Sequence, residues 1–235
     1  RLAMPVPLRT LAVSAALTLA ACTDADPLPS DPPPSPPALA TFEGQYEPVD
    51  DGTAVPGWED FRDSLRATVA RKDTAALLAV VAPDARLSFG DTPPGPEGFR
   101  AMWFSGDPPQ GRDPWSTLRG VLDGGSLDED GAVIAPFVSG LWPDDHDPLS
   151  SVAIVQDSVI ARDAPSRAAA PVARVSHLIL PALAPPNAGW RMVRLPDETV
   201  AYVPAALALS PVGYRATFWA EPDGTWFLRS FLAGD

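Results

Sequence analysis

Few side chains in this sequence are arranged as catalysis or metal binding would require. The chain holds one cysteine, Cys22, and two histidines, His146 and His177. A serine nucleophile needs a histidine base, but neither histidine stands in a recognisable setting and no G-x-S-x-G segment occurs. The acidic run PDDHDP (143–148) around His146 could hold a cation, although a solvated loop explains it more simply. Because phosphate loops, H-E-x-x-H segments and EF-hand loops are also absent from the sequence, we expect no enzyme, no metal and no cofactor.

The composition narrows the classes of partner. Acidic residues outnumber basic ones by 30 to 17, which gives a net charge of −13. Nucleic acids and anionic lipid surfaces are bound through basic patches, so we expect neither as an electrostatic partner. Hydrophobic residues make up 46% of the chain, which is enough for a buried core, and a single cysteine excludes an intramolecular disulfide.

The first residues are typical of an export signal. Arg9 supplies a positive charge ahead of LAVSAALTLAA (11–21), an uncharged stretch shorter than the roughly 20 residues of a membrane span. The stretch ends in LAAC (19–22), which resembles the lipobox of bacterial lipoproteins. The resemblance implies that residues 1–21 are a signal peptide and that Cys22 becomes a lipidated N-terminus. The alternative is an ordinary signal peptide with an incidental cysteine.

The implied lipid would anchor the protein to a membrane of the bacterial cell envelope, facing the periplasm. Thr23 follows the cysteine, and the absence of aspartate there slightly favours the outer membrane. Residues 22–57 are expected to form a Pro-rich, disordered tether, because PLPSDPPPSPP (27–37) has too many prolines for helix or sheet. The alternative role for this run is as a ligand of a proline-binding module, in this chain or another.

Residues 58–150 have the pattern of an α+β region. Phe61, Leu65 and Val69 recur at helical spacing, and Asp73 is typical of the N-cap of a second helix. These helices, followed by PDARLSFG (83–90), resemble the opening of nuclear-transport-factor-2-like α+β domains. That resemblance implies a cone-type domain with a small-molecule-binding or structural role. A plain two-helix hairpin ahead of a strand is the alternative.

Residues 151–210 contain several short strand-like runs separated by turn residues, which is typical of a small sandwich or barrel. Four of these runs carry a more specific pattern: VIARDAPS (159–166), PVARV (171–175), GWRMVRLPD (189–197) and VAYV (200–203). Their order and spacing resemble bacterial SH3 (SH3b) domains. The resemblance implies a small all-β SH3-like barrel that binds peptide, either from the cell wall or from a protein partner.

Three positions depart from the SH3b pattern. Glu198 and Ala201 stand where glycine is usual, and His177 stands in a turn that usually contains glycine. We therefore expect a different type of turn at Glu198.

The candidate ligand-binding residues of the barrel are Tyr202, Trp190 and Arg162. Packing in the core or at its rim is the competing role for the two aromatic rings. For Arg162 the competing role is to brace the loop that follows it.

The final segment, 211–235, contains two aromatic strand-like runs joined by EPDG (221–224), which has turn chemistry. A β-hairpin this apolar is not stable in water on its own, so we expect it to pack against another part of the protein. Either it completes the sheet of residues 58–150, which makes 151–210 an insertion, or it packs on the barrel.

Together these patterns predict an α+β protein: an α+β region at 58–150, a barrel at 151–210 and a C-terminal aromatic hairpin. The expected function is that of a non-catalytic envelope lipoprotein with a binding module. One alternative is a nuclear-transport-factor-2-like domain with an accessory barrel, and another is a degenerate cell-wall hydrolase. An apolar pocket inside residues 58–150 would favour the former alternative, whereas a filled interior would favour the binding module.

Overall fold

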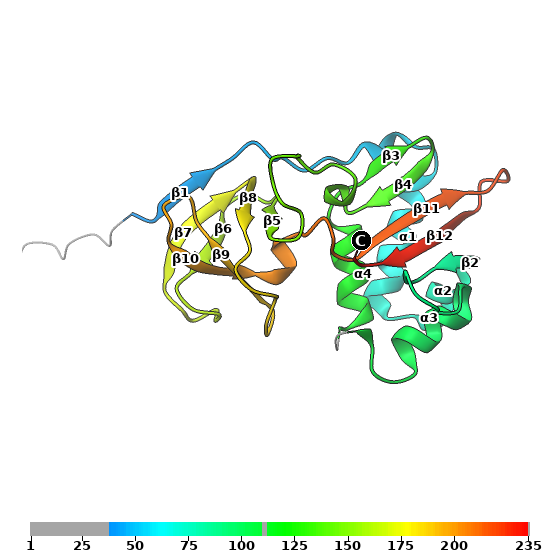
Figure 1. The fold of residues 1–235 in the computed structure, drawn as a ribbon. Coiled ribbons are helices and arrows are strands. Elements are labelled where there is room, and N and C mark those ends of the chain that lie inside the picture. Colours follow the sequence, from blue (N-terminus) through cyan, green and yellow to red (C-terminus); the bar gives the residue numbers. More distant parts are fainter. Residues whose placement is uncertain (1–37, 110–111, 235) are drawn as a thin grey trace, which may run out of the picture. The chain divides into compact units, whose positions relative to one another are not determined.

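The computed structural model describes residues 38–109 and 112–234 (Figure 1). The predicted signal peptide 1–21, the predicted lipidation site Cys22 and the proline-rich run 27–37 lie outside the described residues. The fold is α+β, and its strands form three sheets. From Ala38 onward the chain forms one compact unit.

The first sheet takes its strands from both ends of the described chain. Its order is β2 (Val81–Arg86), β12 (Trp226–Leu232), β11 (Arg215–Ala220), β4 (Ala132–Ala135) and β3 (Leu127–Glu129). The C-terminal hairpin β11–β12 thus lies between β2 and β4. The sequence leaves open whether this hairpin completes the sheet of residues 58–150 or packs on residues 151–210. The strand pairing shows that it completes the sheet. Residues 151–210 leave the sheet after β4 and the chain returns to it at β11.

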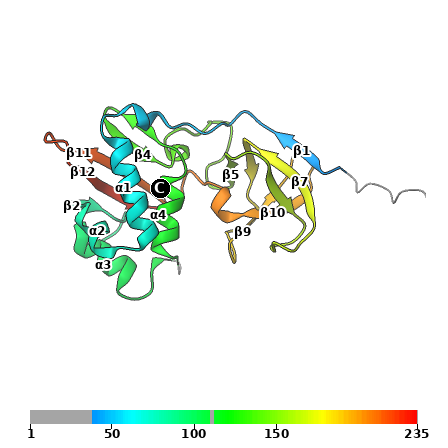
Figure 2. The ribbon, with the colours of Figure 1, turned by 180° about the vertical axis from the view of Figure 1, so that it is seen from behind.

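Four helices accompany this sheet: α1 (Trp58–Arg71), α2 (Thr74–Ala79), α3 (Gly95–Phe104) and α4 (Pro114–Leu122). The longest, α1, and α4 lie side by side on one face of the sheet (Figures 1 and 2). The predicted cap of α2 is confirmed, because the Asp73 carboxylate accepts a hydrogen bond of 3.0 Å from the Ala76 amide. Among the described residues, no helix is both long and apolar enough to cross a bilayer.

Aromatic side chains fill the space between these helices and the sheet. Trp58 from α1 and Phe218 from β11 are fully buried, with ring centroids 4.8 Å apart. Phe99 from α3 stacks on Phe231 from β12 at 5.7 Å. Rings supply much of the buried apolar area of a small core, so this interior is packed by the protein's own side chains.

The remaining strands form a second, five-stranded sheet and a separate pair. The order of the second sheet is β1 (Ala40–Glu43), β7 (Pro171–Ser176), β6 (Val159–Arg162), β10 (Val200–Pro204) and β9 (Trp190–Arg194). The pair consists of β5 (Ser151–Ile154) and β8 (Leu178–Pro181). No closed barrel is found in the part of the chain that the structure describes, because β1 and β9 are the edges of an open sheet.

Residues 38–57 correct the prediction of a disordered tether that reaches to residue 57. Strand β1 pairs in parallel with β7, with Phe42 opposite Val175, and a 3-10 helix, η1 (Asp51–Ala54), follows. An edge strand held by backbone hydrogen bonds needs no side-chain periodicity, so the sequence pattern misses it. Between β1 and η1, Tyr46 donates a hydrogen bond to the Leu141 carbonyl, and burial raises its pKa to about 12.

An enclosed ion pair fastens this N-terminal stretch to α1. Arg62 on α1 is only 7% exposed, and its Nη1 lies 2.8 and 2.7 Å from the two carboxylate oxygens of Asp50. Ser126 Oγ donates a third hydrogen bond of 2.5 Å to Asp50 Oδ1. One carboxylate therefore holds together the N-terminal stretch, α1 and the segment before β3.

We expect Asp50→Ala to lower the free energy of unfolding by about 2–4 kcal/mol, because the Arg62 charge would stay enclosed without its partner. The exposed side of Asp50 keeps the loss below the upper end of the range for buried pairs. Chemical denaturation of the two proteins measures the difference. Asp63→Ala is the matched control, because Asp63 forms only an exposed pair with Arg66 at 3.5 Å and should cost at most about 0.5 kcal/mol. Equal losses in the two variants would contradict the role of the ion pair.

Candidate functional site

The structure brings the three predicted ligand-binding residues of the second sheet onto one face. Tyr202 in β10 lies opposite Arg162 in β6 on one side and opposite Met192 in β9 on the other. Trp190 lies two residues before Met192 and opposite Pro204. Side chains that lie opposite each other, or two residues apart along a strand, project to the same face of a sheet. We call these five residues the aromatic face.

The opposite face of the same strands is buried. Four residues that alternate along the strands with those of the aromatic face are fully buried: Ala161, Val193, Ala201 and Val203. They belong to an apolar cluster that also receives side chains from β5, β7 and β8. The five residues of the aromatic face are half-buried by comparison. The alternation therefore gives these strands a packed inner side and an outer side that is accessible to a ligand.

Exposed apolar residues extend the aromatic face at its edges. The Leu183 amide donates a hydrogen bond of 3.0 Å to the Met192 carbonyl, which places Leu183 beside β9. Leu183 is 37% exposed, and Val200, two residues before Tyr202 on β10, is 44% exposed. Exposed apolar residues from two further positions therefore lie beside the aromatic face.

The rings of Trp190 and Tyr202 are free of partners within the described residues. Neither makes a ring contact or a side-chain hydrogen bond there. Tyr214, by contrast, packs its ring against Trp103 and Phe231, each with a centroid distance of 5.1 Å. An aromatic ring with an unused polar tip can supply both apolar contact and a hydrogen bond to a ligand.

Arg162 has a structural task at the edge of the aromatic face. Its Nη1 donates a hydrogen bond of 2.7 Å to the carbonyl of Ala169, across the loop that separates β6 from β7. The bracing role considered from the sequence is therefore present, and it holds the guanidinium beside Tyr202.

The turn between β9 and β10 corrects one sequence expectation. Glu198 has a φ of 68°, which is the left-handed conformation that glycine favours, rather than a conformation typical of a different turn. Such a conformation costs a non-glycine residue about 1–3 kcal/mol. Hydrogen bonds from the Glu198 amide to the Leu195 carbonyl (3.0 Å) and from the Thr199 amide to Asp197 Oδ1 (3.0 Å) offset this cost.

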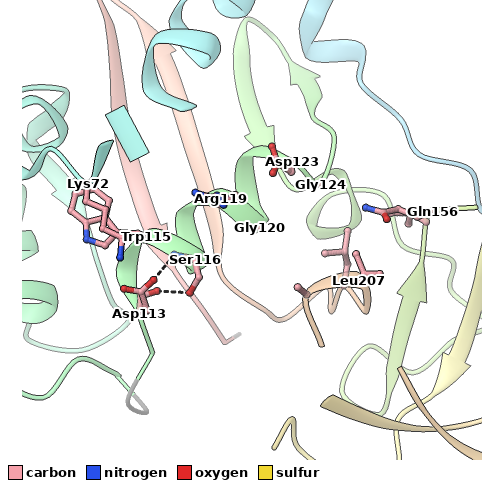
Figure 3. Close-up of a pocket in the computed structure, with 13 residues that line it drawn as sticks. Lys72, Asp113, Trp115, Ser116, Arg119, Gly120, Asp123, Gly124, Gln156 and Leu207 are labelled. Carbon is pink, nitrogen blue, oxygen red and sulfur yellow. Dashed lines mark hydrogen bonds between the residues drawn. The ribbon is translucent and has the colours of Figure 1, made fainter. Parts of the chain in front are cut away.

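A cavity of about 410 Å³ lies beside α4 (Figure 3). Residues of α4 and of the turn after it, from Asp113 to Gly124, form one wall, and Gln156 and Leu207 lie across from them. At its lower end Asp113 caps α4 by accepting a hydrogen bond of 2.8 Å from the Ser116 amide. Arg119 of α4 also lines this cavity.

A second cavity, of about 610 Å³, adjoins the first and contains two arginines, and we call it the arginine cleft. Arg112 and Arg191 line it together with Tyr214, and the Arg112 guanidinium lies 5.7 Å from the Tyr214 ring centroid. Burial, and then the charge of Arg112, lower the pKa of Arg191. Burial raises the pKa of Tyr214, against the effect of Arg112. The sequence carries no signal for this cleft, because its residues come from segments that share no motif.

The histidines form no catalytic arrangement in the described part of the chain. His177 Nε2 lies 2.8 Å from Asp157 Oδ1, and His146 Nε2 lies 3.9 Å from Asp145 Oδ1. Neither ring is hydrogen-bonded to a described serine, threonine or cysteine. In the acidic run, the Ser150 hydroxyl and the Leu149 amide donate to Asp147, which lowers its pKa. No group of side chains among the described residues is suited to hold a metal ion.

Comparison of the chain with protein-family models, with curated proteins and with solved structures found no match.

Proposed function

We propose that this protein is a non-catalytic lipoprotein of the bacterial cell envelope that presents an SH3-like module for binding peptide. The observation that carries the proposal is the aromatic face, where Trp190 and Tyr202 lie half-exposed and without partners on a sheet whose other side is packed. Its ligand is a peptide of the cell wall or a peptide segment of a protein partner. Nucleic acid is not a partner in this proposal.

Strand pairing supports an SH3-like barrel as the architecture of residues 151–210. β6 pairs with β7 and β10, and β10 pairs with β9. β8 follows β7 after the single residue His177, and Ala182 just beyond β8 bridges to Val193 of β9. A strand that bends at His177 would therefore contact β6 with its first half and β9 with its second. This is the curvature that a small closed barrel requires.

The backbone at two unusual positions supports the resemblance to SH3b domains. His177 and Glu198 both have positive φ angles, of 50° and 68°. Both stand where the SH3b pattern has glycine, the residue that adopts this conformation without strain. At both positions the backbone has the conformation that glycine favours, although the residue is not glycine.

The chemistry of the aromatic face favours a peptide ligand that is bound by ring contact. Small protein surfaces bind through a few aromatic anchors rather than through their whole area. Trp190 and Tyr202 offer two such anchors, with Met192 between them as an adaptable apolar contact. The acidic charge of the chain, −13, disfavours long polyanions as ligands.

The membrane anchor in this proposal rests on the sequence LAAC (19–22) and its apolar lead segment. Lipid on Cys22 would attach the protein to the membrane, with the outer membrane slightly favoured, and the module would face the periplasm. One acyl chain gives only marginal binding, whereas the several chains of a lipoprotein would hold it stably.

A second candidate function is a nuclear-transport-factor-2-like domain that binds a small molecule or serves a structural role. The sheet with helices α1 and α4 on one face supports this candidate. Its interior, however, is packed with rings such as Trp58 and Phe218, and both cavities described above lie beside α4, outside that core. The filled interior favours the peptide-binding module. The degenerate hydrolase gains no support from the two histidines.

The anchor is tested by Cys22→Ala. The unaltered protein should incorporate a palmitate analogue and partition into the detergent phase, whereas the variant should do neither, because the acceptor thiol is gone. Circular dichroism should give the same folded spectrum and melting curve for both proteins. Equal labelling of the variant would remove the lipoprotein proposal.

The binding face is tested by co-sedimentation of residues 23–235 with purified sacculi. We expect weak binding that Tyr202→Ala lowers at least about fivefold, the loss typical of a binding anchor. The free energy of unfolding should fall by no more than about 1 kcal/mol, because the ring is half-exposed. The assay is run across salt concentrations, because salt screens the repulsion between acidic protein and anionic stem peptides.

Tyr46→Ala is the matched control for this assay. Its ring packs on Phe137 and Trp142, with centroid distances of 5.4 and 5.8 Å, so the variant should lose stability but bind sacculi as before when folded. Binding no stronger than that of an unrelated protein at every salt concentration would contradict a cell-wall ligand.

A further inference from the structure

Two guanidinium groups share one cleft of a strongly acidic protein. Arg112 precedes α4 and Arg191 lies on β9, and both line the arginine cleft beside Tyr214. They are close enough for the charge of Arg112 to lower the pKa of Arg191, in addition to the effect of burial. The charge of Arg112 thus disfavours the charged form of Arg191, and an anion bound beside Arg191 would favour it.

The donors of Arg191 are only partly used by the protein. Nη1 donates a hydrogen bond of 3.0 Å to the Ala184 carbonyl, but Nε is enclosed and has no acceptor among the described residues. No described carboxylate lies within ion-pair distance of Arg191. Four other arginines each hold at least one carboxylate: Arg62, Arg66, Arg194 and Arg229. The remaining group of Arg191, Nη2, has no acceptor among the described residues and is not enclosed, so it can donate to acceptor oxygens of a ligand in the cleft.

The walls of the cleft restrict what can accompany the anion. One acidic residue, Asp113, also lines the cleft, but its carboxylate caps α4 by accepting a hydrogen bond of 2.8 Å from the Ser116 amide. Other lining residues are small and uncharged: Pro185, Pro186, Ala188, Gly189, Ala205 and Ala206. Such walls suit small apolar groups and offer no further cations for a second or third negative charge. A guanidinium fork matches the two oxygens of a carboxylate, which it can bind with two parallel hydrogen bonds.

We propose that the arginine cleft binds the C-terminal carboxylate of a peptide whose last residues are small and apolar, with Arg112 and Arg191 as the carboxylate-binding residues. The inference rests on the proposed function for the source of that peptide, an alanine-ended cell-wall stem. It adds an end-group site to the aromatic face. Strand β9 would serve both, because it carries Trp190 on the aromatic face and the next residue, Arg191, in the cleft.

Calorimetric titration of residues 23–235 with N-acetyl-D-alanyl-D-alanine tests the site. The acid should bind, and its C-terminal amide should bind at least about tenfold more weakly, because the amide removes the negative charge. Arg112→Gln and Arg191→Gln should each raise the dissociation constant by about tenfold or more. Arg119→Gln is the matched control: it removes the same charge from α4 but lines the neighbouring cavity, so its effect should stay below about twofold.

A further variant guards against loss of folding. Arg191→Lys keeps the positive charge and loses the planar fork, so it should bind more weakly than the unaltered protein and more tightly than Arg191→Gln. Thermal melting shows whether each variant is folded under the titration conditions. Arg112 lies outside the helices and strands. If Arg191→Gln does not fold, the titration of Arg112→Gln therefore tests the site.

The outcomes separate this inference from the proposed function. The L-enantiomer N-acetyl-L-alanyl-L-alanine is titrated alongside, and binding of either acid with the expected variant effects supports the carboxylate site. A strong preference for the L-peptide would support the site while removing the cell wall as its source. Failure of both acids to bind, equal binding of the amide, or an equal effect of Arg119→Gln would overturn the inference. Sacculus binding through Tyr202 would then still stand or fall by its own assay.

Discussion

The pairing of β11 with β4 is the interaction on which the rest of the architecture depends. These two strands are neighbours in the first sheet, although all of residues 151–210 lie between them in the sequence. The intervening segment must therefore leave and return at almost the same place. Ala153 and Leu209 close it near its ends with two backbone hydrogen bonds of 2.7 and 2.9 Å. A segment closed in this way can build a core of its own, and its outer face remains available for binding.

The same pairing fills the interior of the first sheet. Because the hairpin returns, Phe218 and Phe231 enter the space beneath α1 and α3 and fill it together with Trp58. Because these rings are closely packed, the space between the first sheet and its helices is filled by the protein's own side chains. The partnerless rings lie instead on the aromatic face of the second sheet, and the cavities lie along α4. Two partnerless rings and two arginines in one cleft are the features that stability alone does not explain.

Residue patterns within short segments predicted local structure well. They could not predict contacts between segments that are far apart in the sequence. The cap at Asp73 and the period of α1 depend on neighbours within a turn or two, so their residue types suffice. Strand β1 is held by backbone bonds to β7, and such bonds leave no pattern in side-chain types. Glu198 shows that a turn can keep its conformation after losing its glycine when hydrogen bonds hold it. Arg112 and Arg191 meet only through the fold, so their shared cleft had no sequence signal.

The central claim is that the aromatic face, and not the interior of the first sheet, receives the peptide. Its most direct test is a nuclear magnetic resonance titration of residues 23–235 with purified muropeptide, following the indole N–H signals of Trp190 and Trp58. Trp190 is half-exposed on the aromatic face, whereas Trp58 is fully buried in the core of the first sheet. The account predicts that the Trp190 signal shifts with added ligand while the Trp58 signal stays in place. A shift at Trp58 with Trp190 unchanged would contradict the account and would support a ligand inside the α+β domain.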